Sequence, residues 1–215
     1  MTIIILYVNR HFILTEIAAM RFDKGHKEQT RRRIVETAAQ RFRKEGVASV
    51  GIAGLMADAG LTHGGFYAHF ASKEDLVRAA LDEAAAENAA RRAKILETTP
   101  PGPERAEALI RHYLRPAHRD APGLGCTAAA LVAEIARHEP ETRAAFTARL
   151  IALLEQYETS LPPDMDQAAR RRRAIGIFST LLGALQMARA VDDPALSDQI
   201  LEAGTEAALA LVHKA

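Results

Sequence analysis

A short segment in the first third of the chain carries side chains suited to contacts with nucleic acid. Thr62 precedes an expected short helix, so its hydroxyl can cap that helix and can also meet a phosphate oxygen. Gly64 and Gly65 lack side chains, which lets the start of the helix approach base edges closely, and His63 beside them can hydrogen-bond to a base. Lys73 opens the next helix as a phosphate partner. The alternative is that the two glycines serve tight helix packing and that Lys73 is solvated.

The elements that position these side chains are helices, as the apolar spacing predicts. A first helix runs from near Lys27 to Glu45 and ends at Gly46. A short helix follows Ser49, and a tight turn at residues 59–61 leads into a second short helix. Apolar residues on these elements can form a small core: Ile34, Val35, Ala38, Ala39, Phe42, Leu55, Ala59, Leu61, Phe66 and Phe70. This arrangement is typical of a helix-turn-helix.

The run A-G-L-T-H-G-G-F-Y-A-H-F-A-S-K-E-D-L at residues 59–76 resembles the A-G-V-S-x-G-x-L-Y-x-H-F-x-S-K-E-x-L signature of the TetR family, and the resemblance extends over Thr30–Leu81. It implies a homodimer, a short recognition helix in the major groove of a double-stranded DNA operator, and a divergent effector-binding body. Tyr67 and His69 match family positions that touch the DNA backbone, with partly buried core positions as the alternative. The sequence departs from the family pattern at Met56, where a small residue is usual.

Composition and charge agree with this interpretation. Helix-forming Ala, Leu, Arg and Glu dominate from Lys27 onward and runs of Val, Ile and Thr are almost absent, which predicts an all-α fold. The net charge of the chain is only +1, yet residues 21–73 carry ten Lys and Arg against five Asp and Glu. Residues 74–215 carry 17 basic and 21 acidic side chains. The excess positive charge is therefore concentrated where a phosphate backbone could use it, unless it forms a solvated charged face.

Proline and glycine breaks divide the rest of the chain into further helices. A capping box at residues 72–75 opens a long helix that reaches about Glu97, and five more helices are expected near 104–118, 126–138, 140–160, 165–191 and 196–213, for about nine in all. The last two are expected to form the homodimer interface through apolar and small residues at helical spacing: Ile175, Gly176, Phe178, Leu182, Gly183, Ala184, Leu185, Ala188, Arg189, Leu196, Ile200, Ala207, Ala208, Leu211 and Val212. The alternative is that these residues form an intramolecular core.

A small-molecule effector is expected between the middle helices of the body. The candidate wall residues could equally be core: His112, Tyr113, Cys126, Leu131, Phe146 and Tyr157. Cys126 is the only cysteine, which excludes an intramolecular disulfide and a Cys-based zinc site and fits a reducing cytoplasm. Its place at a helix start is also compatible with sensing of electrophiles. An enzyme that uses this thiol, with His112, His118 or His138 as base, is the competing function class, but no Gly-rich phosphate loop, nucleophile elbow or metal cluster in the sequence supports it.

The sequence therefore predicts an all-α protein in two parts. Residues 25–72 form a helix-turn-helix DNA-binding domain and residues 73–215 an effector-binding and dimerisation domain, while residues 1–24 are an extension of unassigned role. No cofactor and no metal are expected, and no apolar stretch is long enough to cross a membrane. The predicted function is that of a cytoplasmic transcriptional repressor released from its operator by a small molecule, with an activator or an architectural DNA-binding protein on the same fold as alternatives.

Overall fold

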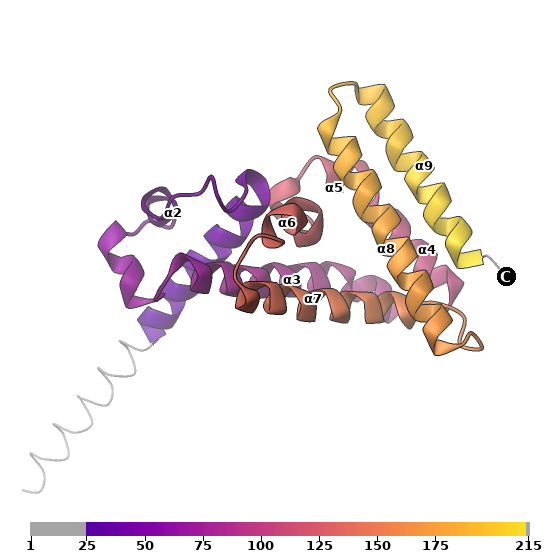
Figure 1. Cartoon of the computed structure of the whole chain (residues 1–215), viewed down its shortest axis with the longest axis horizontal. Coiled ribbons are helices and arrows are strands. Elements are labelled where there is room, and N and C mark those ends of the chain that lie inside the picture. The colour runs from indigo at the N-terminus through magenta and orange to yellow at the C-terminus, as the bar shows by residue number, and fades with distance from the viewer. Residues whose placement is uncertain (1–24, 214–215) are drawn as a thin grey trace, which may run out of the picture.

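The computed structural model describes residues 25–213 and contains no strand in that range (Figure 1). In chain order the structure has a helix that includes residues 25–45, α2 (Ile52–Asp58), η1 (His63–Ala68), α3 (Lys73–Thr98), α4 (Pro103–Tyr113), α5 (Pro116–Arg119), η2 (Pro122–Leu124), α6 (Thr127–Ile135), α7 (Pro140–Glu158), α8 (Gln167–Ala190) and α9 (Pro194–His213). The all-α prediction is confirmed. Among the helices described, none is long and apolar enough to span a membrane.

The loops between helices use residues whose conformational limits end or begin a helix. Gly46 ends the first helix with a φ of 82°, and Gly60 has a φ of 70° in the turn after α2, both in the left-handed region that glycine adopts most easily. Proline opens α4, α5, α7 and α9. At the start of α3 the Asp75 amide donates to Ser72 Oγ at 3.1 Å, and the Asp75 carboxylate accepts the Ala71 amide at 3.1 Å. The Ser72 cap is therefore confirmed, while the acid of the predicted capping box binds the amide of Ala71 instead of that of Ser72.

Two clusters of buried apolar residues form the cores of the molecule. The first joins the helix at 25–45, α2 and η1 to the first half of α3, and it also includes Leu131 and Ile135 of α6. The second is built from α4, α6, α7, α8 and α9. We call residues 25–72 the head and residues 103–213 the body. Figure 1 shows α3 running from the head into the body beside α7, so one helix connects the two cores.

Helices α8 and α9 pack closely against each other within the chain. A Cβ on Gly204 would lie 2.4 Å from the Cβ of Ala184, so the crossing requires glycine. Arg189 donates to the carbonyl oxygens of His118 and Arg119. Several residues predicted to face a partner chain are likewise buried inside this one: Phe178, Ala184, Leu185, Ala188, Ala208 and Val212. The dimer prediction was wrong for these positions, because helical spacing does not distinguish the inner face of a helix pair from the outer one.

Candidate DNA-binding surface and effector cavity

The short helix η1 exposes one row of side chains and buries its anchor. Phe66 is fully buried in the head core, and its ring meets that of Tyr67 edge-on at a centroid distance of 5.2 Å. Tyr67 is 65% exposed, and the His63 ring lies edge-on to it at 6.5 Å. A Cβ added at Gly64 would meet nothing within 4 Å, so packing within this chain does not require glycine there. Together with the exposed Thr62, these residues form a surface that an external molecule can approach closely.

Two other predicted contact residues, Gly65 and Lys73, are more constrained, and Thr62 departs from its prediction in a different way. Thr62 occupies the N-cap position of η1, but its side chain makes no capping hydrogen bond, so the capping prediction was wrong and the hydroxyl is not engaged there. Gly65 is half-buried, and a Cβ at this position would lie 3.7 Å from Met56 Cε, an ordinary contact. Lys73 Nζ donates to the Val47 carbonyl oxygen at 2.6 Å. The ammonium of Lys73 would therefore exchange a protein acceptor for any phosphate it binds.

His69 follows η1 and lies at the edge of the head core. Its Nδ1 is buried and has no hydrogen-bond partner among the residues that the structure describes. Burial lowers the pKa of His69, and the nearby charges of Lys27 and Arg31 lower it further. Arg31 lies over the Phe70 ring, with its Cζ 4.7 Å from the ring centroid. His69 is thus a neutral, half-buried side chain near pH 7 and is less available to DNA than Tyr67.

A cavity of about 590 Å³ lies between α3, α4, α6 and α7, bordered by α5 and η2. This volume is within the range of small-molecule sites, which is roughly 300 to 1,000 Å³. Five of the six predicted wall residues line it: His112, Tyr113, Cys126, Phe146 and Tyr157. Leu131 does not line the cavity. It is 3% exposed and packs in the head core, so its assignment to the cavity wall was wrong.

Polar residues that were not predicted as wall residues also line the cavity: Asp82, Asn88, Arg91, Arg92, Arg115, His118, Thr127, Arg149 and Gln156. Arg92 Nε donates to Gln156 Oε1 at 2.9 Å. Burial lowers the pKa of His112, and the charges of Arg115 and Arg92 lower it further, so the ring is neutral near pH 7. Burial raises the pKa of the Tyr113 phenol well above its ordinary value. The cavity therefore combines apolar walls with a polar region that contains arginines.

Both the head sequence and the whole fold match known proteins. Residues 34–80 match the family described as bacterial regulatory proteins, tetR family. A TetR transcriptional regulator from Chloroflexus aurantiacus J-10-FL has a similar structure, with a TM-score of 0.74 and 26% identity over 88% of this chain and 96% of that one. Residues 34–80 therefore match the tetR family by sequence, and the whole chain shares the fold of a TetR transcriptional regulator.

The similarity of this chain to known regulators is uneven along its length. The HTH-type transcriptional regulator TtgR of Pseudomonas putida is 41% identical over 63 residues, which are 29% of this chain and 30% of that protein. The matched segment thus spans under a third of this curated relative. The structure of AibR in complex with isovaleryl coenzyme A and operator DNA shares the fold at 22% identity, with a TM-score of 0.59 over 82% of this chain and 96% of that one.

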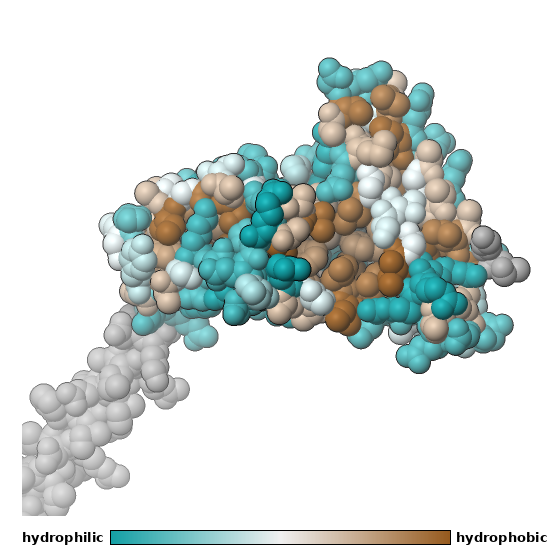
Figure 2. Space-filling view, in the orientation of Figure 1, coloured by the Kyte–Doolittle hydropathy of each residue, from teal (hydrophilic) through white to brown (hydrophobic). Residues whose placement is uncertain are grey.

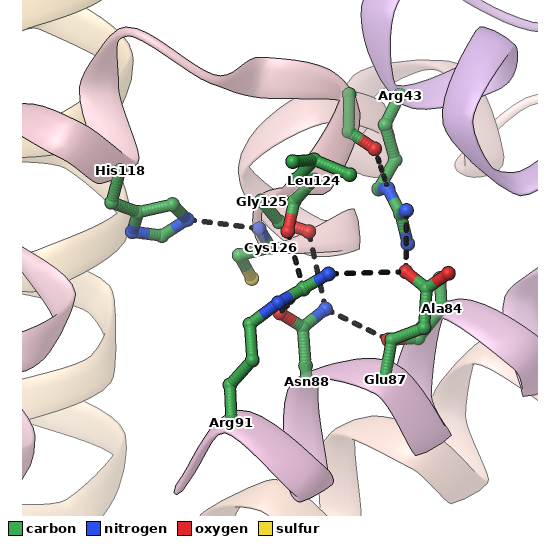
Figure 3. Close-up of polar contacts among 10 residues, drawn as sticks. Arg43, Ala84, Glu87, Asn88, Arg91, His118, Leu124, Gly125 and Cys126 are labelled. Carbon is green, nitrogen blue, oxygen red and sulfur yellow. Dashed lines mark hydrogen bonds and ion pairs between the residues drawn. The ribbon is translucent and has the colours of Figure 1, made fainter.

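Hydrogen bonds join the head to the segment that borders the cavity (Figure 3). Arg43 extends from the first helix and is buried, and its Nε donates to the Gly123 carbonyl oxygen at 2.7 Å. The same guanidinium donates to Glu87 on α3 at 2.7 Å. The next residue along α3 is Asn88, whose Nδ2 donates to the Gly125 carbonyl oxygen at 3.1 Å. The loop before α6 is therefore fixed to both α3 and the head.

Helix α6 connects the cavity and the head by its two ends. Cys126 and Thr127 at its start line the cavity. Near its end the Glu134 carboxylate accepts the Val47 amide at 2.6 Å, and Leu131 packs in the head core. Helix α6, which is nine residues long, therefore contacts both the cavity and the head.

His118 holds the start of α6 and is not placed to act as a base. Its Nε2 accepts the Cys126 amide at 3.0 Å, and Nδ1, which then carries the proton, donates to the Tyr113 carbonyl oxygen at 2.6 Å. Burial lowers the pKa of His118 to about 4, and the charges of Arg189 and Arg115 contribute. Both ring nitrogens are occupied, so this histidine cannot take the proton of the thiol. Within residues 25–213, no group of three His, Cys, Asp or Glu is placed to hold a metal.

Proposed function

We propose that the protein is a dimeric transcriptional repressor of the cytoplasm that leaves its operator when a small molecule fills the body cavity. The observation that carries this proposal is the position of α6, which lines the cavity at Cys126 and contacts the head at Glu134. A molecule that displaces the start of α6 also moves the loop that contains Val47, because the Glu134 carboxylate binds its amide. The fold shared with AibR, whose structure contains isovaleryl coenzyme A and operator DNA, supports a ligand-responsive role.

The proposed DNA-reading surface is the exposed row on η1. In this proposal His63 hydrogen-bonds to a base edge, and Thr62 and Tyr67 bind phosphate oxygens; the exposure of all three side chains supports these roles. Lys73 would bind phosphate after leaving the Val47 carbonyl, which makes it a weaker contributor than its charge suggests. The remaining members of the proposed contact set are Gly64, Gly65 and His69.

The proposed dimer surface is the outer face of α8 and α9. Apolar and small residues there are exposed or half-buried in the single chain: Ile175, Leu182, Gly183, Met187, Leu196, Ile200, Ala203 and Ala207. Figure 2 shows apolar side chains gathered along α8 and over the middle of the body. Exposed apolar surface of this kind is typical of interfaces between chains. A two-fold axis at this surface would place two heads on the same side of the DNA.

Selection of binding sites from random double-stranded DNA tests the DNA-binding proposal. The expected site is a palindrome whose half-sites lie about 34 to 36 Å apart, or a multiple of that. His63→Ala should relax the preference at one base pair, and Lys73→Ala should weaken all sequences about equally. Lys94→Ala, which removes an exposed lysine from the same helix far from the head, is the matched control and should change neither. Recovery of no preferred sequence would refute the proposal.

Alkylation of the only cysteine tests the response of the head to the cavity. N-ethylmaleimide attached to Cys126 occupies the cavity wall, so the modified protein should release its operator, and the extent of release should follow the extent of modification measured by mass spectrometry. Cys126 is 8% exposed, so the reaction should be slow compared with that of an exposed thiol. Cys126→Ser is the control and should keep operator binding after the same treatment. Full modification without loss of operator binding would exclude coupling through α6.

A further inference from the structure

Two arginines in the cavity wall have no acidic partner. Among the described residues, neither Arg92 nor Arg115 has a carboxylate oxygen within 4.0 Å, whereas the cavity cation Arg149 is paired with Asp82. The side-chain hydrogen bond of Arg92 goes to the neutral amide of Gln156 at 2.9 Å. Half-buried guanidinium groups normally have a charged partner, so these two form an uncompensated positive region inside the cavity.

His112 lies between these charges and does not neutralise them. Arg115 donates to the His112 ring, and both Arg115 and Arg92 act on the ring strongly enough to lower its pKa after burial has done so. A neutral imidazole can accept a hydrogen bond but supplies no negative charge. The net charge of this group of three side chains is therefore about +2 near pH 7.

Two hydroxyl groups in the same region lack hydrogen-bond partners. Tyr113 is 8% exposed, and its Oη and the Thr127 Oγ1 are buried without a partner among the described residues. Both residues line the cavity. Tyr113 also lies close enough to Arg92 for its phenol to influence the pKa of that guanidinium. The Tyr113 phenol lies beside the Cys126 thiol, which is only a weak hydrogen-bond partner. Since buried hydroxyls are almost always satisfied in folded proteins, both hydroxyls are available to donate to a bound group.

The rest of the wall is apolar. Leu81, Leu109, Phe146, Leu150 and Leu153 line the cavity along α3, α4 and α7. These side chains can cover a hydrocarbon chain or ring but provide no polar partner for it. The wall therefore combines apolar side chains with two arginines and the two hydroxyl donors.

We propose that this cavity binds an amphipathic carboxylate. Its carboxylate group pairs with Arg92 and Arg115 and accepts hydrogen bonds from Tyr113 and Thr127, while its hydrocarbon part lies against the leucines and Phe146. The planar guanidinium fork matches the two oxygens of a carboxylate. The proposal rests on the proposed effector site for its link to DNA release, but carboxylate binding itself is measured without DNA.

Calorimetric titration of the full-length protein tests the ligand class. The carboxylate probes are hexanoate, octanoate, decanoate and 4-phenylbutyrate, and each is compared with the alcohol of the same carbon skeleton. Octanoyl coenzyme A is titrated as a further probe. At least one carboxylate should bind one site per chain at least about tenfold more tightly than its alcohol. Arg92→Gln should weaken that carboxylate by about 10- to 100-fold, the range expected for loss of a hydrogen bond to a charged group. Arg111→Gln is the matched control on the exposed face of α4 and should not change binding.

Three results of the titration would overturn the proposal. These are equal binding of a carboxylate and its alcohol, no binding of any carboxylate, and binding of the coenzyme A thioester alone. Each of these would leave the proposed repressor function intact, because operator binding by the wild-type protein is measured separately without any probe. Loss of operator binding in that separate measurement would refute the repressor function and leave carboxylate binding standing.

A second measurement distinguishes a ligand-binding arginine from a structural one. Because Arg92 lacks an acidic partner, Arg92→Met should raise the melting temperature of the protein without ligand, and octanoate should then no longer raise it further. If Arg92 instead supports the fold through Gln156, the same variant will melt at a lower temperature and still be stabilised by octanoate. That second pattern would overturn the proposal.

Discussion

Acidification should weaken the folded state through His118. In the folded protein its pKa is about 4, because burial and nearby arginines disfavour the charged ring. In the unfolded chain an ordinary histidine has a pKa of about 6.5. Between these two values the unfolded chain binds a proton that the folded chain does not, so stability decreases as the pH falls. The contribution of His118 is fully present above pH 6.5 and is lost progressively as the pH falls toward 4.

The magnitude follows from the difference between the two pKa values. Each pKa unit corresponds to about 1.4 kcal/mol, so lowering the pH from 7 to 4.5 should remove roughly 2 to 3 kcal/mol of unfolding free energy through this one residue. His118→Gln removes the titration while its amide oxygen can still accept the Cys126 amide. The free energy of unfolding of this variant should therefore fall less steeply with pH than that of the wild-type protein.

Urea denaturation followed by circular dichroism, at pH steps between 7 and 4.5, measures this difference. Exposed His63 provides the control, since His63→Gln leaves the buried site unchanged and should follow the wild-type profile. If the free energies of unfolding of wild type and His118→Gln fall in parallel as the pH is lowered, His118 does not cause the loss of stability.

Three further predictions concern packing and assembly. Gly204→Ala should destabilise the protein by about 1 to 3 kcal/mol in urea denaturation, because its Cβ collides with that of Ala184, and an unchanged midpoint would contradict the contact. Leu182→Glu should give folded monomers, as measured by size-exclusion chromatography with light scattering. Leu185 is fully buried, so Leu185→Glu should instead lose its helical circular dichroism signal. A folded monomer from Leu185→Glu would contradict the burial of this residue. Arg43→Met should lower the unfolding free energy by about 1 to 3 kcal/mol, because the Gly123 carbonyl oxygen loses its donor and Glu87 keeps only the longer contact with Arg91. Wild-type stability of this variant would show that the fold does not depend on these two hydrogen bonds.

The head could be predicted almost completely from the sequence, because its determinants are local. Gly60 marks the turn, and Phe66 and Phe70 recur at helical spacing as anchors, so the short helices and their buried faces follow from neighbouring residues. The contact between Lys73 and Val47 could not be predicted in this way. These residues are 26 positions apart, and only the folded head brings the ammonium to that carbonyl.

The body was less predictable because each of its helices has more than one neighbour. Leu131 and Tyr157 both looked like cavity residues, yet Leu131 belongs to the head core, since α6 turns that face away from the cavity. Arg92 on α3 faces the cavity, whereas Arg111 on α4 faces solvent. Nothing in the sequence around either arginine indicates this difference. Burial of a charge depends on which helices surround it, and that information is not local.

Helix α3 is continuous through both cores, so a tilt of this helix in the body displaces the head. Its 26 residues span roughly 39 Å at about 1.5 Å per residue. A tilt of about 5° around its body end moves the end at Lys73 by roughly 3 Å. In the proposed dimer, two such movements in opposite directions would change the separation of the two heads by roughly 6 Å, compared with a half-site spacing of about 34 to 36 Å. A rearrangement that is too small to alter the packing of the body therefore produces a much larger displacement at the proposed DNA-binding surface.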